Sequence, residues 1–195
     1  MACGAILGGG QARRFGGRDK SALVVQGRTI RERQLDVLRA VTRRILLVGA
    51  TADARLPADV EPVPDRTPGC GPLGGLDAAL AAADGAPVLL VACDMPFLSA
   101  ALLRAMLADL HGVDAVVPRT ERGYHPLCAV YGPACQAAVR RRLEHGALRV
   151  RDLFDDVRVR VVEGPDLARF GEPSHLLANV NTQADLDALE SLRNH

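Results

Sequence analysis

The sequence predicts an α/β protein: a single domain over residues 1–195, built of three layers, with helices on both faces of a mostly parallel sheet. Short continuous apolar runs, such as Ile45–Val48 and Val88–Ala92, alternate with segments whose apolar residues recur at helical spacing. The chain is 48% hydrophobic but only 3% aromatic. Its core must therefore consist of Leu, Val and Ala, as is usual where helices cover buried parallel strands. A chain of 195 residues is long enough for one such core.

The first half of the chain predicts a strand–helix–strand unit. The apolar run Ala5–Leu7 ends a strand because three glycines follow it. Residues 22–25 predict a short strand before a turn at Gly27, and apolar residues at helical spacing predict a helix over 30–41. The run Ile45–Val48 predicts the second core strand. A right-handed crossover would make these two core strands parallel neighbours.

The second half predicts further alternation of strands and helices. The helix after residue 99 is expected to have Ser99 as its N-cap. The expected elements, in order, are a strand over 60–63, a helix that opens within 64–75 and runs to about 83, a strand over 88–92, the Ser99-capped helix, a strand over 115–118, a polar loop over 119–124, a strand over 127–131, a helix over 133–145 framed by Pro133 and Gly146, a short helix over 150–154, a strand over 157–162, and a strand ending within 176–182 before a last helix capped by Thr182 and Asp185.

Composition argues against several classes of function. The net charge is +1, which gives no electrostatic footprint for nucleic acid or an anionic membrane, and there are few aromatic residues for stacking on bases. No apolar run reaches membrane-spanning length. The five cysteines form no CxxC pair and are expected to be small buried hydrophobes in a reducing cytosol. With no basic region ahead of the first strand, the expected location is cytoplasmic.

Residues 5–21 predict a loop that binds phosphate groups. Gly8, Gly9 and Gly10 carry no Cβ, so their backbone N–H groups can approach a bulky anion. Basic residues then gather within eight positions: Arg13, Arg14, Arg18 and Lys20. Lys20 is the only lysine among 24 basic residues, and its flexible ammonium suits a point contact with phosphate.

Two common phosphate loops do not match this stretch. The Walker A pattern requires glycine directly before Lys-Ser, where this chain has Asp19. The dinucleotide fingerprint requires a third glycine, where this chain has Arg13, and an acid at the end of the second strand, where it has Gly49. The loop is longer and more basic than either.

Two further segments predict parts of a site. The Gly/Pro-rich stretch Pro64–Gly75 leads into a helix, and a helix amino terminus directs backbone N–H groups toward a ligand. Asp94 follows the strand over 88–92, at the carboxyl end where open α/β sheets bind ligands. Near a phosphate loop, this carboxylate can hold Mg²⁺, which prefers carboxylate, phosphate and water oxygens.

The loop Leu7-Gly8-Gly9-Gly10-x-x-x-Arg14-Phe15-Gly16-x-x-Asp19-Lys20 resembles the Leu-Ala-Gly-Gly-x-x-x-Arg-Met-Gly-x-x-Lys signature of the GT-A-like nucleotidyltransferases. Among these it is most similar to the molybdenum cofactor guanylyltransferases, often called MobA. Gly8 and Phe15 are mild departures from that signature. The segment over 65–75, Cys93-Asp94-Met95-Pro96, His125-Pro126 and Asn179-Val180-Asn181-Thr182 resemble further motifs of the family, in the same order.

The resemblance implies a Rossmann-like sheet and transfer of GMP from GTP to the terminal phosphate of molybdopterin, with Mg²⁺ and with release of pyrophosphate. It implies that Arg14 and Lys20 neutralise phosphates and that Asp94 is the metal ligand. The nucleotide-binding residues implied are Leu7, Gly8, Gly9, Gly10, Lys20, Asp65, Gly71, Gly74 and Asp94. The acceptor-binding residues implied are His125, Asn179 and Asn181. A labile product also suggests direct transfer to partners, namely a molybdenum insertase and target apoenzymes.

Alternatives stay open at this point. Gly9-Gly10 fits the family's guanine enzymes, whereas cytosine-using relatives carry Ala-Gly. Gly49-Ala50 departs from the family, whose members often place Asn just after the second strand. The chain could therefore transfer CMP to molybdopterin, or a nucleotide to a sugar phosphate or another phosphorylated acceptor. It could also be a non-catalytic nucleotide-binding or cofactor-delivery protein.

Overall fold

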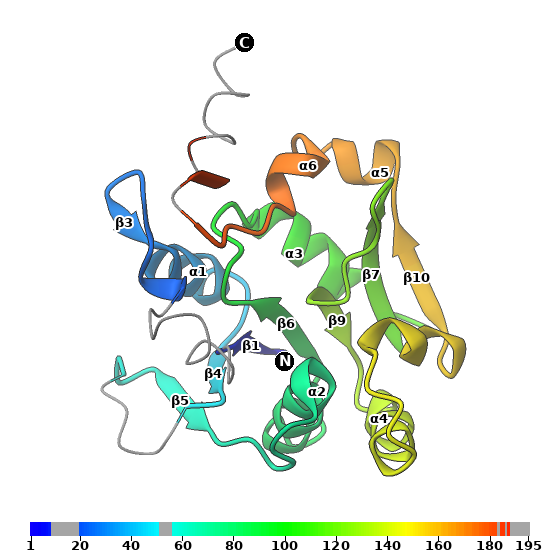
Figure 1. Cartoon of the computed structure of the whole chain (residues 1–195). Helices are drawn as coiled ribbons and strands as arrows, with labels where there is room; N and C mark the ends of the chain where they lie inside the picture. The colour runs from blue at the N-terminus through cyan, green and yellow to red at the C-terminus, as the bar shows by residue number, and fades with distance from the viewer. Residues whose placement is uncertain (9–19, 51–55, 183, 186, 188–195) are drawn as a thin grey trace.

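A mixed sheet forms the centre of the molecule (Figure 1). The computed structural model describes residues 1–8, 20–50, 56–182, 184, 185 and 187, and of Lys20 only the backbone. Among these residues eight strands share the sheet. In spatial order they are β10 (Val159–Val162), β7 (Ala115–Thr120), β9 (Cys128–Tyr131), β6 (Val88–Ala92), β1 (Cys3–Leu7), β4 (Arg44–Val48) and β5 (Val60–Val63), with β8 (Gly123–Tyr124) beside β7.

Most neighbouring strands are parallel. β1 lies between β4 and β6 and is parallel to both, and β5 and β10 are parallel to β4 and β7. β9 runs antiparallel to both of its neighbours, β6 and β7. The predicted parallel pairing of the first two core strands is confirmed, with Leu7 beside Val48. β1, β4, β6 and β9 are almost wholly buried because helices cover both faces of the sheet.

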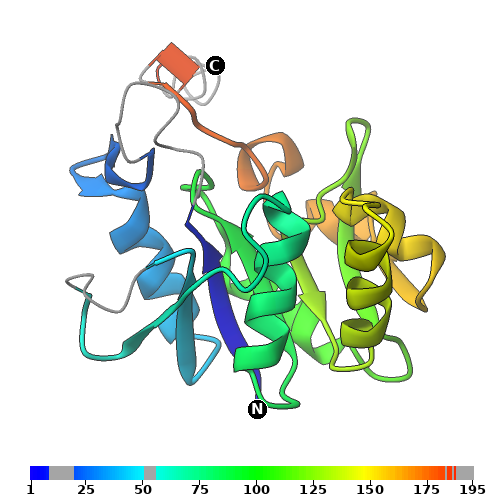
Figure 2. The same cartoon turned by 60° about the horizontal axis from the view of Figure 1, so that its bottom comes forward.

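Helices form the outer two layers. α1 (Ile30–Arg39) and α3 (Ala100–Ala108) pack on one face, together with the short helices α5 (Pro165–Ala168) and α6 (Pro173–Leu176). α2 (Gly71–Ala82), α4 (Cys135–Glu144) and the 3-10 helix η3 (Val150–Asp155) pack on the other, where α2 and α4 lie side by side in Figure 2. The predicted α/β architecture with a mostly parallel sheet is confirmed.

Two predictions of local structure are confirmed with shifted bounds, and two are wrong. The short strand predicted over 22–25 is β2 (Val24–Val25), which pairs with β3 (Arg28–Thr29), and residues 20–22 form a 3-10 helix before it. The predicted polar loop over 119–124 continues β7 and forms β8, because cross-strand pairing outweighs its polar composition. α4 begins two residues after Pro133, with Ala134 as N-cap. Pro173–Leu176 is helical, and no strand is found over 176–182.

The cysteines follow the prediction in part. Cys3, Cys128 and Cys135 are buried, and burial raises the pKa of the Cys128 and Cys135 thiols to about 12. These two thiols are therefore protonated at neutral pH and serve as small apolar groups. Cys70 and Cys93 are only partly buried: Cys70 is the N-cap of α2, and Cys93 is the first residue after β6.

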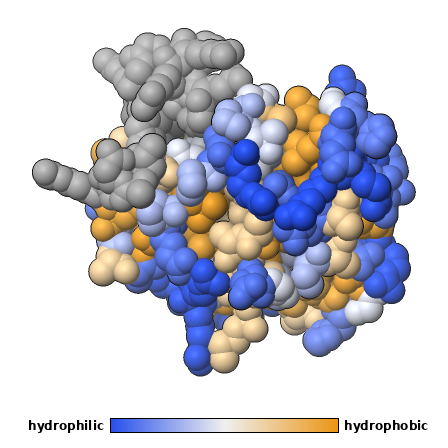
Figure 3. Space-filling view, turned by 90° about the horizontal axis from the view of Figure 1, so that it is seen from below, coloured by the Kyte–Doolittle hydropathy of each residue, from blue (hydrophilic) through white to orange (hydrophobic). Residues whose placement is uncertain are grey.

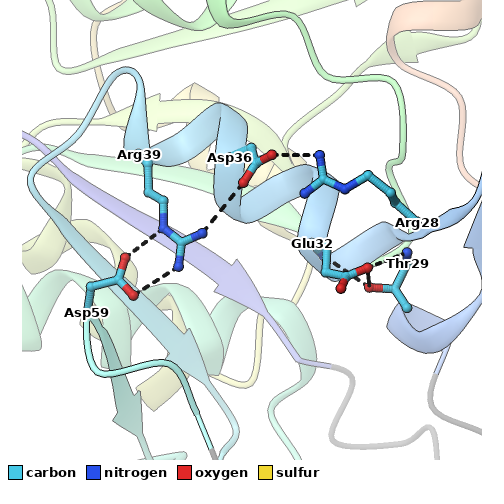
Figure 4. Close-up of polar contacts among 6 residues, drawn as sticks. All are labelled: Arg28, Thr29, Glu32, Asp36, Arg39 and Asp59. Atoms are coloured by element: carbon cyan, nitrogen blue, oxygen red, sulfur yellow. Dashed lines mark hydrogen bonds and ion pairs between the residues drawn. The ribbon is translucent and has the colours of Figure 1, made fainter.

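The amino end of α1 is fixed by polar contacts (Figure 4). Thr29 and Glu32 form a capping box: the Glu32 N–H donates to Thr29 Oγ1 at 3.2 Å, and the Thr29 N–H donates to Glu32 Oε2 at 2.8 Å. On the exposed face of the helix, Arg28 contacts Asp36 at 2.7 Å, and Arg39 links Asp36 to Asp59. These contacts join α1 to the β2–β3 hairpin and to the turn before β5.

The Asp36 carboxylate makes stability depend on pH. Its hydrogen bond from Arg28 lowers the pKa of Asp36 below its ordinary value. A group with a lowered folded-state pKa stabilises the protein above its unfolded pKa of about 4, and this contribution is lost as pH falls through the folded pKa. We expect the free energy of unfolding to fall from about pH 5 to pH 3, and to fall less steeply in Asp36→Asn. Urea unfolding at stepped pH measures both slopes, and equal slopes would contradict the assignment.

The surface of the α2 and α4 face mixes hydrophilic and hydrophobic residues, as Figure 3 shows. This mixture agrees with the near-neutral charge of the chain. Within the described ranges, no helix has both the length and the apolar character needed to cross a membrane.

Candidate functional site

The predicted site residues follow three neighbouring strands at one edge of the sheet. β1, β4 and β6 are parallel, and their last residues, Leu7, Val48 and Ala92, lie in register. In Figure 2 the N-terminus lies at the bottom, so these carboxyl ends lie at the top of the sheet. Gly8, Gly49 and the turn carrying Asp94 therefore come out beside one another, at the edge where α/β sheets bind ligands.

Gly8 and Gly49 allow the ends of β1 and β4 to approach closely. The Gly8 N–H donates to the Val48 carbonyl at 2.9 Å, and a Cβ on Gly8 would lie only 2.9 Å from that oxygen. Gly49 has φ +83°, and a Cβ there would lie 2.9 Å from the Gly8 carbonyl oxygen. This backbone region favours Gly, and Asn among the other residues, which is a conformational reason for Gly49 where the family often carries Asn.

Asp65 lies at the same edge. A Cβ on Gly49 would be 3.8 Å from Asp65 Oδ1 and 3.9 Å from Oδ2, so this carboxylate sits beside the β4 end. The predicted nucleotide-binding residues Gly8 and Asp65 are thus both near Gly49. Because Gly49 has no side chain, the Gly8 carbonyl and the Asp65 carboxylate can both lie close to the end of β4.

The Gly/Pro-rich segment brings the amino end of α2 against β1. α2 begins at Gly71, with φ +57°, and a Cβ on Gly75 would lie 2.7 Å from Leu7 Cδ2. A Cβ on Gly74 would lie 3.0 Å from that of Cys70 and 3.2 Å from the Thr67 carbonyl oxygen. Glycines therefore let the helix pack closely on the strand that precedes the phosphate loop.

Asp77 is a residue that the sequence interpretation missed. Asp77 lies on α2 and is 4% exposed, and its carboxylate contacts Arg66 at 3.7 Å and Arg140 at 3.4 Å. Through Arg66 it connects α2 to the segment that carries Asp65, and through Arg140 to α4. The sequence did contain a signal for Asp77: it is the one acidic residue in the otherwise apolar segment over 71–82.

Asp94 and Asn179, far apart in the sequence, lie in contact. The Asn179 Nδ2 donates to Asp94 Oδ1 at 3.1 Å, and the Val180 N–H donates to the Asp94 carbonyl at 2.8 Å. Ser99 caps α3, accepting from the Leu102 N–H, so the capping role predicted for it is confirmed. The structure thus joins the predicted metal ligand to one of the predicted acceptor residues.

The donor set near Asp94 suits Mg²⁺ shared with a nucleotide. Among the residues described, no three of His, Cys, Asp or Glu gather closely enough to hold a metal by themselves. A single carboxylate is what Mg²⁺ commonly takes from a protein when phosphates and water supply its other ligands. Asp94 fits this requirement.

A pocket of about 900 Å³ lies beside this edge, between the β7–β8 hairpin and the α5–α6 segment, which are neighbours in Figure 1. His125 lines it, with Nε2 2.9 Å from Thr120 Oγ1. Burial, and secondly the charge of Arg122, lower the pKa of His125. The ring is therefore neutral at pH 7, able to hydrogen-bond but carrying no charge.

The charged lining of this pocket was also missed, because residues 119–122 resembled an ordinary polar loop. Arg119 forms an ion pair with Glu163, whereas Arg122 is exposed and has no acidic partner within the described part of the chain. Leu177 also lines the pocket. It lies two residues before Asn179, whose side chain bonds Asp94, so a short stretch of chain leads from the pocket lining to this carboxylate.

Several of the predicted site residues are not found next to Asp94 or the pocket in the described part of the chain. Gly9, Gly10 and Arg14 lie outside the described residues, as does the side chain of Lys20. The Asn181 N–H donates to Asp185 Oδ2, and Asp185 with Thr182 forms the predicted capping box.

The fold defines an α/β protein whose candidate site lies at the carboxyl ends of its parallel strands, where proteins of this class bind ligands. Comparison with known families makes this specific. The chain belongs to the family of the MobA-like NTP transferase domain, whose family model matches residues 4–161.

Known relatives cover nearly the whole chain. A probable molybdenum cofactor guanylyltransferase from Pelotomaculum thermopropionicum is 37% identical, over 95% of this chain and 90% of the relative. A molybdenum cofactor guanylyltransferase from Desulfosudis oleivorans is 31% identical, over 96% and 94%. The crystal structure of molybdopterin-guanine dinucleotide biosynthesis protein A from Archaeoglobus fulgidus has a similar fold, with a TM-score of 0.79 and 23% identity over 100% of this chain and 99% of that one.

Proposed function

We propose that this protein transfers GMP from GTP to the terminal phosphate of molybdopterin, forming the guanine dinucleotide cofactor and releasing pyrophosphate. The observation that carries the proposal is the bond between Asn179 and Asp94, which joins the turn after β6 to the segment that follows Leu177, a residue of the pocket lining. The two substrates are proposed from the names of two relatives, 31 and 37% identical, that are called molybdenum cofactor guanylyltransferases.

The nucleotide would occupy the carboxyl edge of β1, β4 and β6. Gly8, with Gly9 and Gly10, would donate backbone N–H groups to phosphate oxygens, and Arg14 and Lys20 would neutralise the charge of the departing pyrophosphate. Asp65, Gly71 and Gly74 would hold the base and ribose, where α2 begins next to β1. Asp94 would hold Mg²⁺, which supplies charge neutralisation between the reacting phosphate and the leaving group.

The acceptor would enter from the pocket between β7–β8 and α5–α6. Its phosphate is already ionised at neutral pH, so this residue set needs to position two anions rather than remove a proton. Arg122, which forms no ion pair among the described residues, would attract the anionic acceptor, and the neutral His125 ring would hydrogen-bond it. Asn179 would contact the acceptor phosphate next to Asp94, a role that its hydrogen bond to this carboxylate supports.

The test begins with calorimetric titration of GTP, CTP, ATP and UTP, each with Mg²⁺. We expect tight binding of GTP only, and chromatographic detection of the dinucleotide product when molybdopterin is added. Preference for CTP would assign the protein to cytidylyl transfer. Nucleotide binding without product from molybdopterin or from sugar phosphates would instead identify a binding or delivery protein.

A molybdenum insertase and target apoenzymes stay predicted partners. A pull-down with the purified proteins, with and without GTP and molybdopterin, tests direct transfer. Failure of every candidate to bind the loaded protein would contradict it.

A further inference from the structure

Gln34 has a buried side-chain amide that hydrogen-bonds the turn carrying Asp94. It lies on α1 and is 1% exposed. Its Nε2 group donates to the Ala92 carbonyl at 2.7 Å and to the Met95 carbonyl at 3.0 Å. These two acceptors bracket Asp94 in the chain. One side chain therefore fixes both the entrance and the exit of the turn.

Other contacts hold the same turn from two sides. Next to Gln34, Arg33 Nε donates to the Pro96 carbonyl at 3.0 Å. From a separate segment of the chain, Val180 and Asn179 bond the backbone and side chain of Asp94. The turn is thus clamped between α1 and the 177–181 segment, at the point where the regular ladder of β6 has ended.

Packing alone does not explain why a polar residue occupies this buried position. Its Oε1 is buried and has no hydrogen-bond partner in the described part of the chain. A buried amide oxygen without a partner costs free energy, and an apolar side chain of similar size would avoid that cost. The two donated bonds are what distinguish Gln34 from such a side chain.

The same helix also reaches the end of the phosphate loop. Arg31 Nη2 lies 2.6 Å from Ser21 Oγ, and Ser21 directly follows Lys20. Arg31 and Gln34 are three positions apart, so they lie on one side of α1. The helix therefore sets the distance between the residue after Lys20 and the turn that carries Asp94.

We propose that Gln34 is a positioning residue for Asp94: it holds the turn after β6 in the geometry in which the carboxylate meets the metal–nucleotide complex. This inference rests on the proposed function of Asp94. It adds a residue of α1, remote in sequence from every motif, to the machinery of the site.

The test compares Gln34→Met and Gln34→Glu with the wild type. Met keeps the volume and removes both donors; Glu keeps the shape and, when ionised, also removes both. Affinity for the Mn²⁺–GTP complex is measured from the loss of the free Mn²⁺ signal in electron paramagnetic resonance. Affinity for GTP in EDTA is measured by calorimetry.

We expect both variants to bind Mn²⁺–GTP about tenfold more weakly, as is typical when a group that orients a metal ligand is removed. GTP affinity in EDTA should change less than about twofold because the phosphate loop is intact. The KM for the metal–GTP complex should rise along with its Kd, and turnover should fall. Leu38→Met is the matched control. Leu38 lies on the same buried stripe but packs against Gly4, at the start of β1.

The outcomes separate the two proposals. If Asp94→Asn weakens Mn²⁺–GTP binding but a folded Gln34 variant does not, the positioning role is wrong and the proposed role of Asp94 stands. If Asp94→Asn also leaves Mn²⁺–GTP binding unchanged, the metal role of Asp94 is wrong and the inference fails with it. Circular dichroism confirms that each variant is folded, and either Gln34 variant alone decides the question.

Discussion

The Asp94→Asn variant should fold, bind GTP and lose nearly all transfer of GMP. We expect kcat to fall by about 10³-fold, because charge neutralisation at a transferring phosphoryl group contributes several kcal/mol and each ~1.4 kcal/mol is a factor of ten. The amide has the shape of the carboxylate and can still meet Asn179, so the turn after β6 should survive. What it lacks is the negative charge that a hard cation requires.

Steady-state assays of pyrophosphate release, with Mg²⁺ varied, measure this effect. Asp84→Asn is a suitable control, because Asp84 is exposed, has φ +49°, and lies in a backbone region that Asn tolerates. That variant should keep wild-type turnover. If Asp94→Asn retained more than a tenth of wild-type kcat, the assignment of Asp94 to the reacting phosphates would fail.

The Gly49→Ala variant should be the more damaging of two glycine substitutions with the same backbone requirement. Left-handed backbone costs a non-glycine residue about 1–2 kcal/mol, and crowding adds about 1–3 kcal/mol more. Both terms apply at Gly49, where φ is +83° and the added Cβ would lie 2.9 Å from the Gly8 carbonyl oxygen. We expect a total loss of about 2–5 kcal/mol in the free energy of unfolding.

Gly27→Ala isolates the first term. Gly27 has φ +78°, but a Cβ there meets nothing within 4 Å, so only the backbone term of about 1–2 kcal/mol applies. Urea unfolding of both variants measures the difference. Gly49→Ala should also weaken GTP binding, since the displaced Gly8 begins the phosphate loop, whereas Gly27→Ala should not. Equal effects of the two variants would show that the β1–β4 approach does not matter.

Local sequence was sufficient for most of the fold. Continuous apolar runs identified β1, β4, β6 and β9 because strands buried on both faces have no polar side. Helical spacing identified α1, and the capping residues Ser99 and Thr182 were recognisable because an N-cap bonds a backbone group only three residues away. These features depend on neighbours in the chain.

The misjudged elements depend on partners elsewhere in the chain. β8 exists only because it pairs with β7, and α6 stands where the sequence indicated a strand. Residues 119–122 look like an ordinary loop until the hairpin places them opposite α5 and α6, where they line a pocket. Polar composition cannot distinguish a solvated loop from the wall of a site.

For the site, the sequence by itself determined the chemistry that each motif can perform: a glycine-rich basic loop for phosphates, and an acid at a strand end for a metal. Only the tertiary structure brought Asn179 to Asp94 across 85 positions of sequence, and Gln34 to the turn after β6 across 58. The physical reason is range. Propensity, capping and apolar periodicity act over a few residues, whereas hydrogen bonds between distant segments form only after the sheet and its two helical layers have set which chain ends meet.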